Sequence, residues 1–163
     1  MFYAIVLGIH ILAAVLFIGP QVFLVAAAVP ALRSIQDVKQ RQEASRMMTG
    51  RFGWLGGAAL LVLLITGVIN YYHVSSDLHD TDATRYFVTL QIKLTLVAVV
   101  VVFTLLHGAV FGRRLQQLQE RGASEAELAQ TRRWSMMLSM ATLVASIIIL
   151  FLAAVLGSSW ATA

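Results

Sequence analysis

Three ionisable side chains, His10, Lys93 and His107, lie inside long apolar stretches of the sequence. An ionisable group at membrane depth costs free energy, so each of them indicates a partner or a function. A neutral imidazole is a common axial ligand of haem iron, and the interior of a helix bundle commonly holds such a site. A lysine at the same depth can pair with a haem propionate or donate a proton. These residue types predict a cofactor or metal site between helices.

The apolar stretches that carry these residues are long enough to be membrane-spanning helices. The chain of 163 residues is 59% hydrophobic and only 12% charged, which is more apolar surface than a soluble domain of this size can hide. Four runs, at about 2–32, 52–72, 86–112 and 131–160, each exceed the ~20 residues that cross the hydrocarbon core. The sequence therefore predicts one all-α transmembrane domain over residues 1–163, an integral membrane four-helix bundle with up-down-up-down order.

Charge placement predicts the orientation of the helices. Ten of the twelve Lys and Arg residues fall in the loops after the first and third runs or at the first residues of the fourth run, whereas the loop after the second run is acidic. By the positive-inside rule the basic loops are cytoplasmic, so both termini lie outside, and a bacterial inner (plasma) membrane is the expected location. Basic residues confined to short loops follow membrane topology, so the net charge of +4 does not indicate nucleic-acid binding.

Local motifs predict a helix start and the packing faces. Ser124 followed by Glu125 and Glu127 predicts that a helix begins within the second basic loop. Pro20 should kink the first helix. Small residues form a stripe on the fourth run: Ser135, Ser139, Thr142, Ser146, Ala153 and Gly157. Because small residues let helices approach closely in lipid, the stripe predicts packing within the bundle or, alternatively, a homodimer or a contact in a larger membrane complex.

Depth along the helices separates the candidate site residues. At 1.5 Å per residue, His10 lies ~12 Å and Lys93 ~10 Å from the outer ends of their helices, so the two can share a layer. Asn70 and His73 end the second run at the same face. His107 lies only ~9 Å from the cytoplasmic surface and more than ~8 Å from His10 along the membrane normal. His10 and His107 are therefore a poor pair of axial ligands for one iron.

Each candidate also has a purely structural interpretation. Lys93 can extend its ammonium group to the outer interface, and His10 can be a hydrogen-bonded histidine between helices with no ligand. His107 can be a structural histidine near the interface. Arg51 can be a topology charge, or it can pair with a lipid phosphate.

A copper site is a second chemical interpretation. Thioether sulfurs suit Cu(I), and the sequence has no cysteine to supply thiolates. Methionines lie at the cytoplasmic end of the fourth run, at a depth similar to that of His107, and in the first basic loop: Met136, Met137, Met140, Met47 and Met48. Methionine at a helix end is also a common apolar filler, which is the structural alternative.

Short motifs in three runs resemble a known family. The stretch from His10 to Gly19, and the second run with Arg51-Phe-Gly-Trp54 and Thr66-Gly67, resemble the copper resistance D superfamily. The third run has Lys93-Leu94 early and His107-Gly108 before a Gly-Arg-Arg motif, and is similar to the HemJ-type protoporphyrinogen oxidase branch. That branch implies four-helix membrane proteins that bind haem b and oxidise protoporphyrinogen. The copper resistance branch implies copper handling across the membrane.

The leading hypothesis from the sequence is a haem b-binding membrane redox protein. The resemblance implies that a histidine, an arginine and a lysine matter, and the matching positions are His10 as axial ligand, Arg51 and Lys93. The iron would stay five-coordinate or take a second ligand such as His73, with Asn70 beside it. The alternatives are a copper-binding or copper-permeation protein, with His107 among its metal ligands, and a non-catalytic accessory subunit of a membrane complex.

Overall fold

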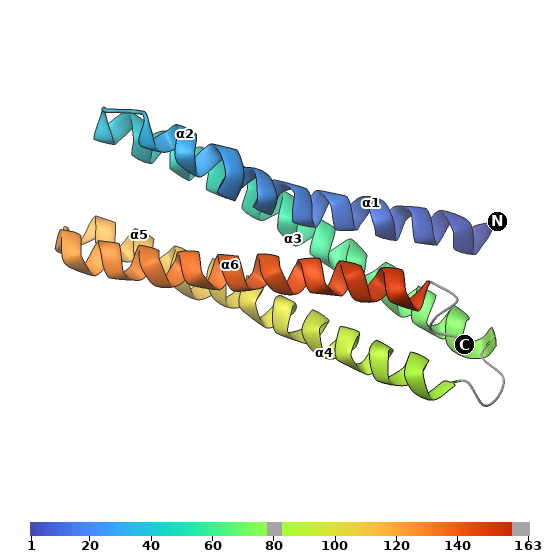
Figure 1. The fold of residues 1–163 in the computed structure, drawn as a ribbon. Coiled ribbons are helices and arrows are strands. Elements are labelled where there is room, and N and C mark those ends of the chain that lie inside the picture. The colour runs from blue at the N-terminus through green and yellow to red at the C-terminus, as the bar shows by residue number, and fades with distance from the viewer. Residues whose placement is uncertain (78–82, 158–163) are drawn as a thin grey trace. The chain divides into compact units, whose positions relative to one another are not determined.

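The computed structural model describes residues 1–77 and 83–157, and every element in these residues is helical (Figure 1). In chain order the elements are α1 (Phe2–Phe23), η1 (Leu24–Ala28), α2 (Val29–Arg33), α3 (Val38–Asp77), α4 (Ala83–Leu106), η2 (His107–Gly112), α5 (Arg113–Glu120) and α6 (Glu125–Leu156). The acidic residues Asp80 and Asp82 and the predicted end of the fourth helix at residue 160 lie outside the described residues.

Four helical stretches are long and apolar enough to cross a membrane: Phe2–Arg33, Val38–His73, Tyr86–Glu120 and Glu125–Leu156. The predicted all-α class and the four spans are therefore confirmed, and they are compatible with a bundle. The side of the membrane on which the termini lie stays a prediction.

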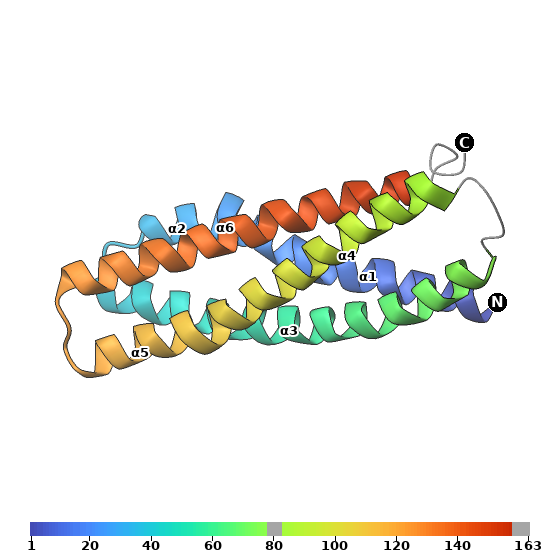
Figure 2. The same cartoon turned by 90° about the horizontal axis from the view of Figure 1, so that it is seen from below.

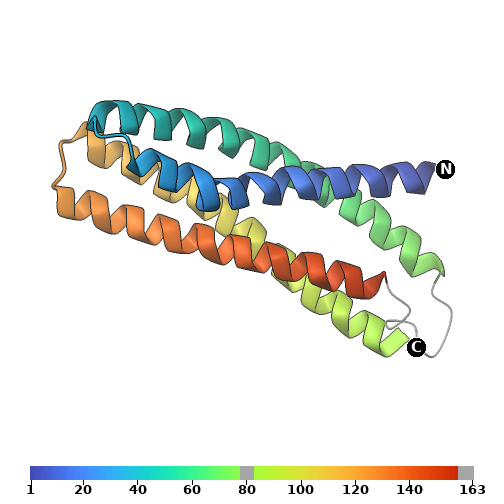
Figure 3. The same cartoon turned by 45° about the horizontal axis from the view of Figure 1, so that its top comes forward.

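Contacts between helices divide the chain into two compact units, Met1–His79 and Asp80–Ala163. The single domain over residues 1–163 stays a prediction. In the first unit α1 lies antiparallel beside α3 (Figures 1 and 3). In the second unit α4 lies antiparallel beside α6, with α5 continuing α4 toward the turn (Figure 2). Each unit is therefore a helical hairpin.

Helix α3 begins at Val38 rather than at the predicted residue 52. The residues before 52 are rich in Lys, Gln, Arg, Glu, Ala and Met, which all favour helix. Asp37 caps the start, because its Oδ1 accepts hydrogen bonds from the backbone N–H groups of Lys39 at 2.8 Å and Gln40 at 3.3 Å. Most of the first basic loop is thus an extension of the spanning helix.

Helix α6 begins at Glu125, where a capping box starts it, and it continues without a break into the span that was predicted from residue 131. The Ser124 hydroxyl accepts from the backbone N–H of Glu127 at 3.3 Å, and the Glu127 carboxylate accepts from the backbone N–H of Ser124 at 3.3 Å. The predicted helix start at Ser124 is confirmed.

Each hairpin contains a π-helical segment in its first arm, η1 after α1 and η2 after α4. Pro20 lies one turn before η1 and has no N–H to donate to the carbonyl of Leu16. The side-chain amide of Gln21 donates to the carbonyl of Phe17 at 3.0 Å in the same turn. Segments of this kind are frequent at functional sites, and η2 begins at His107.

The buried face of α1 is a stripe with spacings of three and four residues. Val6, Ala13 and Phe17 are buried there, and the half-buried His10 lies in the same stripe. On α3 the buried residues are Ala59, Leu60 and Thr66. His10 therefore lies on the face of α1 that packs against α3, rather than on a face left to lipid.

The buried face of α6 is the small-residue stripe that the sequence predicts for packing. Thr142 and Ser146 are buried, and their hydroxyls donate to the carbonyls of Leu138 and Thr142 on the same helix, both at 2.8 Å. These hydroxyls are satisfied locally, so the side chains can be buried without a polar partner on another helix. The stripe continues to Ser135 and Ser139, which contact His107 at the start of η2, so it packs within the hairpin.

Candidate metal sites

His10 is held in place by a hydroxyl from the facing helix. Its Nδ1 lies 2.7 Å from Oγ1 of Thr66 on α3, and Thr66 is only 6% exposed. Gly67 also lies next to the imidazole ring, because a Cβ at Gly67 would lie 3.5 Å from Cε1 of His10. The imidazole is thus packed against α3 at a residue pair, Thr66-Gly67, that the sequence singled out only through a family resemblance.

The hydrogen bonds of Thr66 determine which nitrogen of His10 carries the proton. The Thr66 hydroxyl donates its single proton to the carbonyl of Val62 at 2.6 Å. It must then accept the hydrogen bond from His10, so the proton of the neutral imidazole is on Nδ1. Nε2 consequently carries the lone pair. This is the tautomer in which histidine binds a metal through Nε2 while a second residue orients the ring through Nδ1.

His73 lies in a different layer of the same hairpin. Its ring stacks on Tyr3, with ring centroids 3.5 Å apart and an angle of 3° between the planes. Tyr3 precedes His10 by seven residues and His73 follows Thr66 by seven, so the two layers are about 10 Å apart along the helices. Asn70 is half-buried on α3 between them. The structure thus does not bring His73 to His10 as a second axial ligand.

His107 is held by two hydroxyls of the facing helix in the second unit. Its Nδ1 lies 3.4 Å from Oγ of Ser135 and 3.3 Å from Oγ of Ser139, which are one turn apart on α6. The sequence predicted only a packing role for these serines and missed this contact. Their spacing of four residues was the available signal, because it places both hydroxyls on one helix face.

Two of the predicted copper-binding methionines directly follow these serines. Met136 and Met140 lie about 100° around α6 from Ser135 and Ser139. They are 47% and 37% exposed. Met137 lies on the opposite side of α6 from the two hydroxyls, and is 52% exposed. Met136 and Met140 are therefore the methionines nearest in angle to His107.

Lys93 and Arg51 are not brought to a histidine of their own unit. Lys93 is half-buried on α4, fourteen residues and about 21 Å from His107. Arg51 is exposed on α3, fifteen residues and about 22 Å from Thr66. The predicted sharing of a layer by His10 and Lys93 stays a prediction, and so do the catalytic roles of Lys93 and Arg51.

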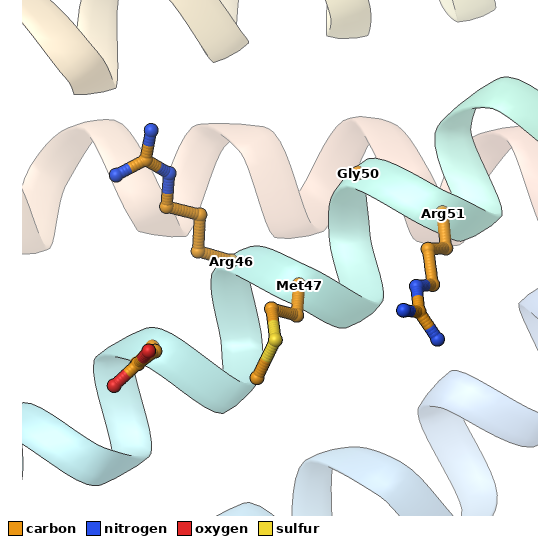
Figure 4. A pocket seen from close by; sticks show the side chains of 5 residues that line it. Arg46, Met47, Gly50 and Arg51 are labelled. Atoms are coloured by element: carbon orange, nitrogen blue, oxygen red, sulfur yellow. The ribbon is translucent and has the colours of Figure 1, made fainter.

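Arg51 lines a shallow surface hollow on α3 together with Glu43, Arg46, Met47 and Gly50. Met47 and Arg51 point to one side of α3, whereas Arg46 points to the other (Figure 4). The two guanidinium groups therefore do not converge on a common point. This hollow contains both acidic and basic side chains, and they do not converge on a point where a metal or an anion would bind.

Comparison with known proteins identifies the family. The family model for copper resistance protein D matches residues 46–156, which is more than half of the chain. This chain belongs to the copper resistance protein D family. No curated protein and no solved structure matches it.

The family match changes the weight of the sequence-based hypotheses. It favours the copper alternative over the leading haem hypothesis, and it does not show the HemJ-type branch. The matched segment of this copper resistance D family member includes His107, Ser135, Met136 and Met140, whereas His10 precedes it. A copper-related membrane protein is the function class that the family supports.

The donor atoms of the described residues fit a soft metal ion better than a hard one. In residues 1–77 and 83–157, no group of three or more His, Cys, Asp or Glu side chains could hold a metal ion. Hard divalent cations such as Mg²⁺ and Ca²⁺ need several oxygen ligands, which these residues do not assemble. Imidazole nitrogen and thioether sulfur are the donor types in this sequence that suit Cu(I).

Proposed function

We propose that this copper resistance D family member handles copper within the membrane, and that it binds Cu(I) at His107 of η2 together with Met136 and Met140 of α6. One observation carries the proposal: two hydroxyls from α6 lie at Nδ1 of His107, and the next residue after each of them is a methionine. The whole arrangement lies within the segment that matches the family.

The chemistry of the proposed site follows from the two nitrogens of His107. Ser135 and Ser139 face Nδ1, so Nε2 is the nitrogen that would bind the metal ion. A proton on Nδ1 that is donated to these hydroxyls fixes the ring orientation and makes Nε2 a better donor. Uncharged imidazole and thioether ligands also avoid the large cost of burying carboxylates in an apolar region.

A metal site with a small number of ligands is better suited to passing a metal ion on than to storing it. A site on a membrane path must bind an ion well enough to accept it and weakly enough to release it. One imidazole and two thioethers form such an exchangeable site, and the absence of cysteine from the sequence removes the tighter thiolate alternative. Copper is thus proposed here as cargo rather than as a permanent cofactor.

Titration of the purified protein with Cu(I) tests the proposal. The full chain in detergent, kept reduced and free of oxygen, would compete with a chromogenic Cu(I) chelator. We expect saturable binding that is lost in His107→Ala and weakened in Met136→Leu and Met140→Leu. The double variant Ser135→Ala/Ser139→Ala should weaken binding by roughly 10-fold to 100-fold, the usual effect of removing residues that orient a metal ligand.

Met137→Leu is the matched control, since Met137 lies on the other side of α6 and should contribute nothing. The proposal is wrong if His107→Ala, still folded by its detergent melting curve, binds Cu(I) as tightly as the unchanged protein. Equal losses in the Met136, Met137 and Met140 variants would contradict the assignment of the thioether ligands.

A haem site at His10 is a second candidate, and the tautomer set by Thr66 favours it. A proton on Nδ1 of His10 is the tautomer in which a histidine binds haem iron through Nε2. An absorption spectrum after haem supply separates the two candidates. A Soret band that is lost in His10→Ala and kept in His107→Ala would support haem. No Soret band in the unchanged protein would remove this candidate and leave the copper proposal unaffected.

A further inference from the structure

The second unit carries a basic hollow near the turn of its hairpin. This arginine hollow lies on η2, α5 and the start of the turn, and its lining residues are Ala109, Val110, Arg113, Arg114, Gln117, Leu118 and Arg121. Three of the seven are arginines and none is acidic, so the lining favours an anionic ligand.

Two of the three arginines make no ion pair within the described part of the chain. Arg121 pairs with Glu127 at 3.3 Å, across the turn before α6. Arg113 and Arg114 are exposed, and the described residues offer neither of them an ion pair. A guanidinium group presents several N–H donors in one plane and matches the oxygens of a phosphate. Arg113 and Arg114 are therefore the groups that can contact a phosphate.

The position of the hollow selects the kind of anion. It lies at the end of the apolar span Tyr86–Glu120, where hydrocarbon gives way to the headgroup region. Ala109 and Val110 supply apolar surface on the η2 side, and the arginines follow on the α5 side. A ligand that fits both parts has a phosphate joined to an apolar chain.

We propose that the arginine hollow binds an anionic phospholipid, with Arg113 and Arg114 at its phosphate and its acyl chain beside Ala109 and Val110. Basic clusters at the ends of spanning helices attract anionic lipid headgroups in this way. The hollow on α3 differs, since it contains Glu43 and its two arginines point to opposite sides of the helix (Figure 4). The proposal is independent of copper or haem binding.

Native mass spectrometry of the full chain in nonionic detergent tests this site. Short-chain phosphatidylglycerol would be titrated as the probe, with phosphatidylcholine of the same chain length and inorganic phosphate in parallel. We expect one saturable phosphatidylglycerol site. Arg113→Gln/Arg114→Gln should weaken it by roughly 30-fold, as expected when two basic contacts near a membrane surface are lost.

Arg132→Gln/Arg133→Gln is the matched control, because it removes the same charge from exposed positions on α6 outside the hollow. It should leave the affinity within about twofold, a margin well below the effect of losing one basic contact. Arg113→Lys/Arg114→Lys keeps the charge and should retain most of the binding. Circular dichroism establishes that each variant is folded.

Three results would overturn the proposal. The first is unchanged affinity in Arg113→Gln/Arg114→Gln, and the second is an equal loss in both glutamine variants, which would make net charge rather than the hollow responsible. The third is binding of phosphatidylcholine or inorganic phosphate as tight as that of phosphatidylglycerol, because the ligand would then not be an anionic lipid.

Discussion

Replacement of Thr66 by valine tests the contact that orients His10. Valine has nearly the same volume, so the main loss is the hydroxyl that accepts the hydrogen bond from Nδ1 of His10 at 2.7 Å. One hydrogen bond contributes about 0.5–1.5 kcal/mol, and bonds between helices in membranes average about 0.6 kcal/mol with a maximum near 1.7. Thr66 is buried, which places this bond in the upper part of that range. We expect Thr66→Val to lower the free energy of unfolding by about 1–1.5 kcal/mol.

Equilibrium unfolding in mixed micelles of dodecyl maltoside and SDS measures this change. Thr104→Val is the matched control, because the Thr104 hydroxyl is half-buried and donates to the carbonyl of Val100 on its own helix at 2.8 Å. Its loss should change the free energy by no more than about 0.5 kcal/mol.

A double-mutant cycle with His10→Ala isolates the pair. Residues in contact couple, so we expect an interaction energy of about 1 kcal/mol between His10 and Thr66. A value below about 0.3 kcal/mol, the usual error for independent sites, would refute the argument. Nitrogen NMR of labelled histidine adds a separate check, since a proton on Nε2 of His10 in the unchanged protein would contradict the tautomer derived from Thr66.

Further substitutions probe the packing and the helix start, with the same unfolding assay except where stated. Gly67→Ala places its Cβ 3.5 Å from His10, an ordinary contact, so stability should stay level or rise by up to about 1 kcal/mol through helix propensity. Gly67→Leu should cost about 1–3 kcal/mol by overpacking, and an equal cost for Ala and Leu would contradict the geometry. Ser146 is 3% exposed, so Ser146→Ala should change the free energy of unfolding by no more than about 0.5 kcal/mol, whereas Ser146→Leu should lower it by about 1–3 kcal/mol. If Ser146→Leu leaves the stability unchanged, this face of α6 does not pack inside the hairpin. Ser124→Ala removes the capping box with Glu127 and should destabilise the start of α6 by about 1 kcal/mol. Faster amide hydrogen exchange at the first turn of α6 measures this change, and unchanged exchange would refute the capping role of Ser124.

The spanning helices were predictable, but their ends near the basic turns were not. Hydropathy marks where the chain leaves hydrocarbon, and for this reason it predicts helix starts at about residues 52 and 131. A helix does not have to end there, and in α3 and α6 it continues through charged residues of high helix propensity to a capping residue, Asp37 or Ser124. Only the second cap was recognised in the sequence, because acidic residues of the first helical turn follow it directly.

The sequence predicted which residues are candidates for the site, but it did not predict which side chains contact them. The sequence singled out His10 and His107 because ionisable groups in apolar runs require an explanation. It did not reveal that Thr66 faces the first of them or that Ser135 and Ser139 face the second. It also offered His73 as a partner of His10, whereas the structure places His73 against Tyr3, two turns away.

The sequence by itself determined that this protein is helical and spans a membrane, because long apolar runs have no other stable form in lipid. It also determined which few polar side chains lie within those runs. Only the tertiary structure decided which helices pair and in what register. Register depends on how side chains of two helices fit together, and a shift of one turn, about 5.4 Å, would give each histidine a different partner. The hydroxyls at Nδ1 of His10 and His107 follow from that register.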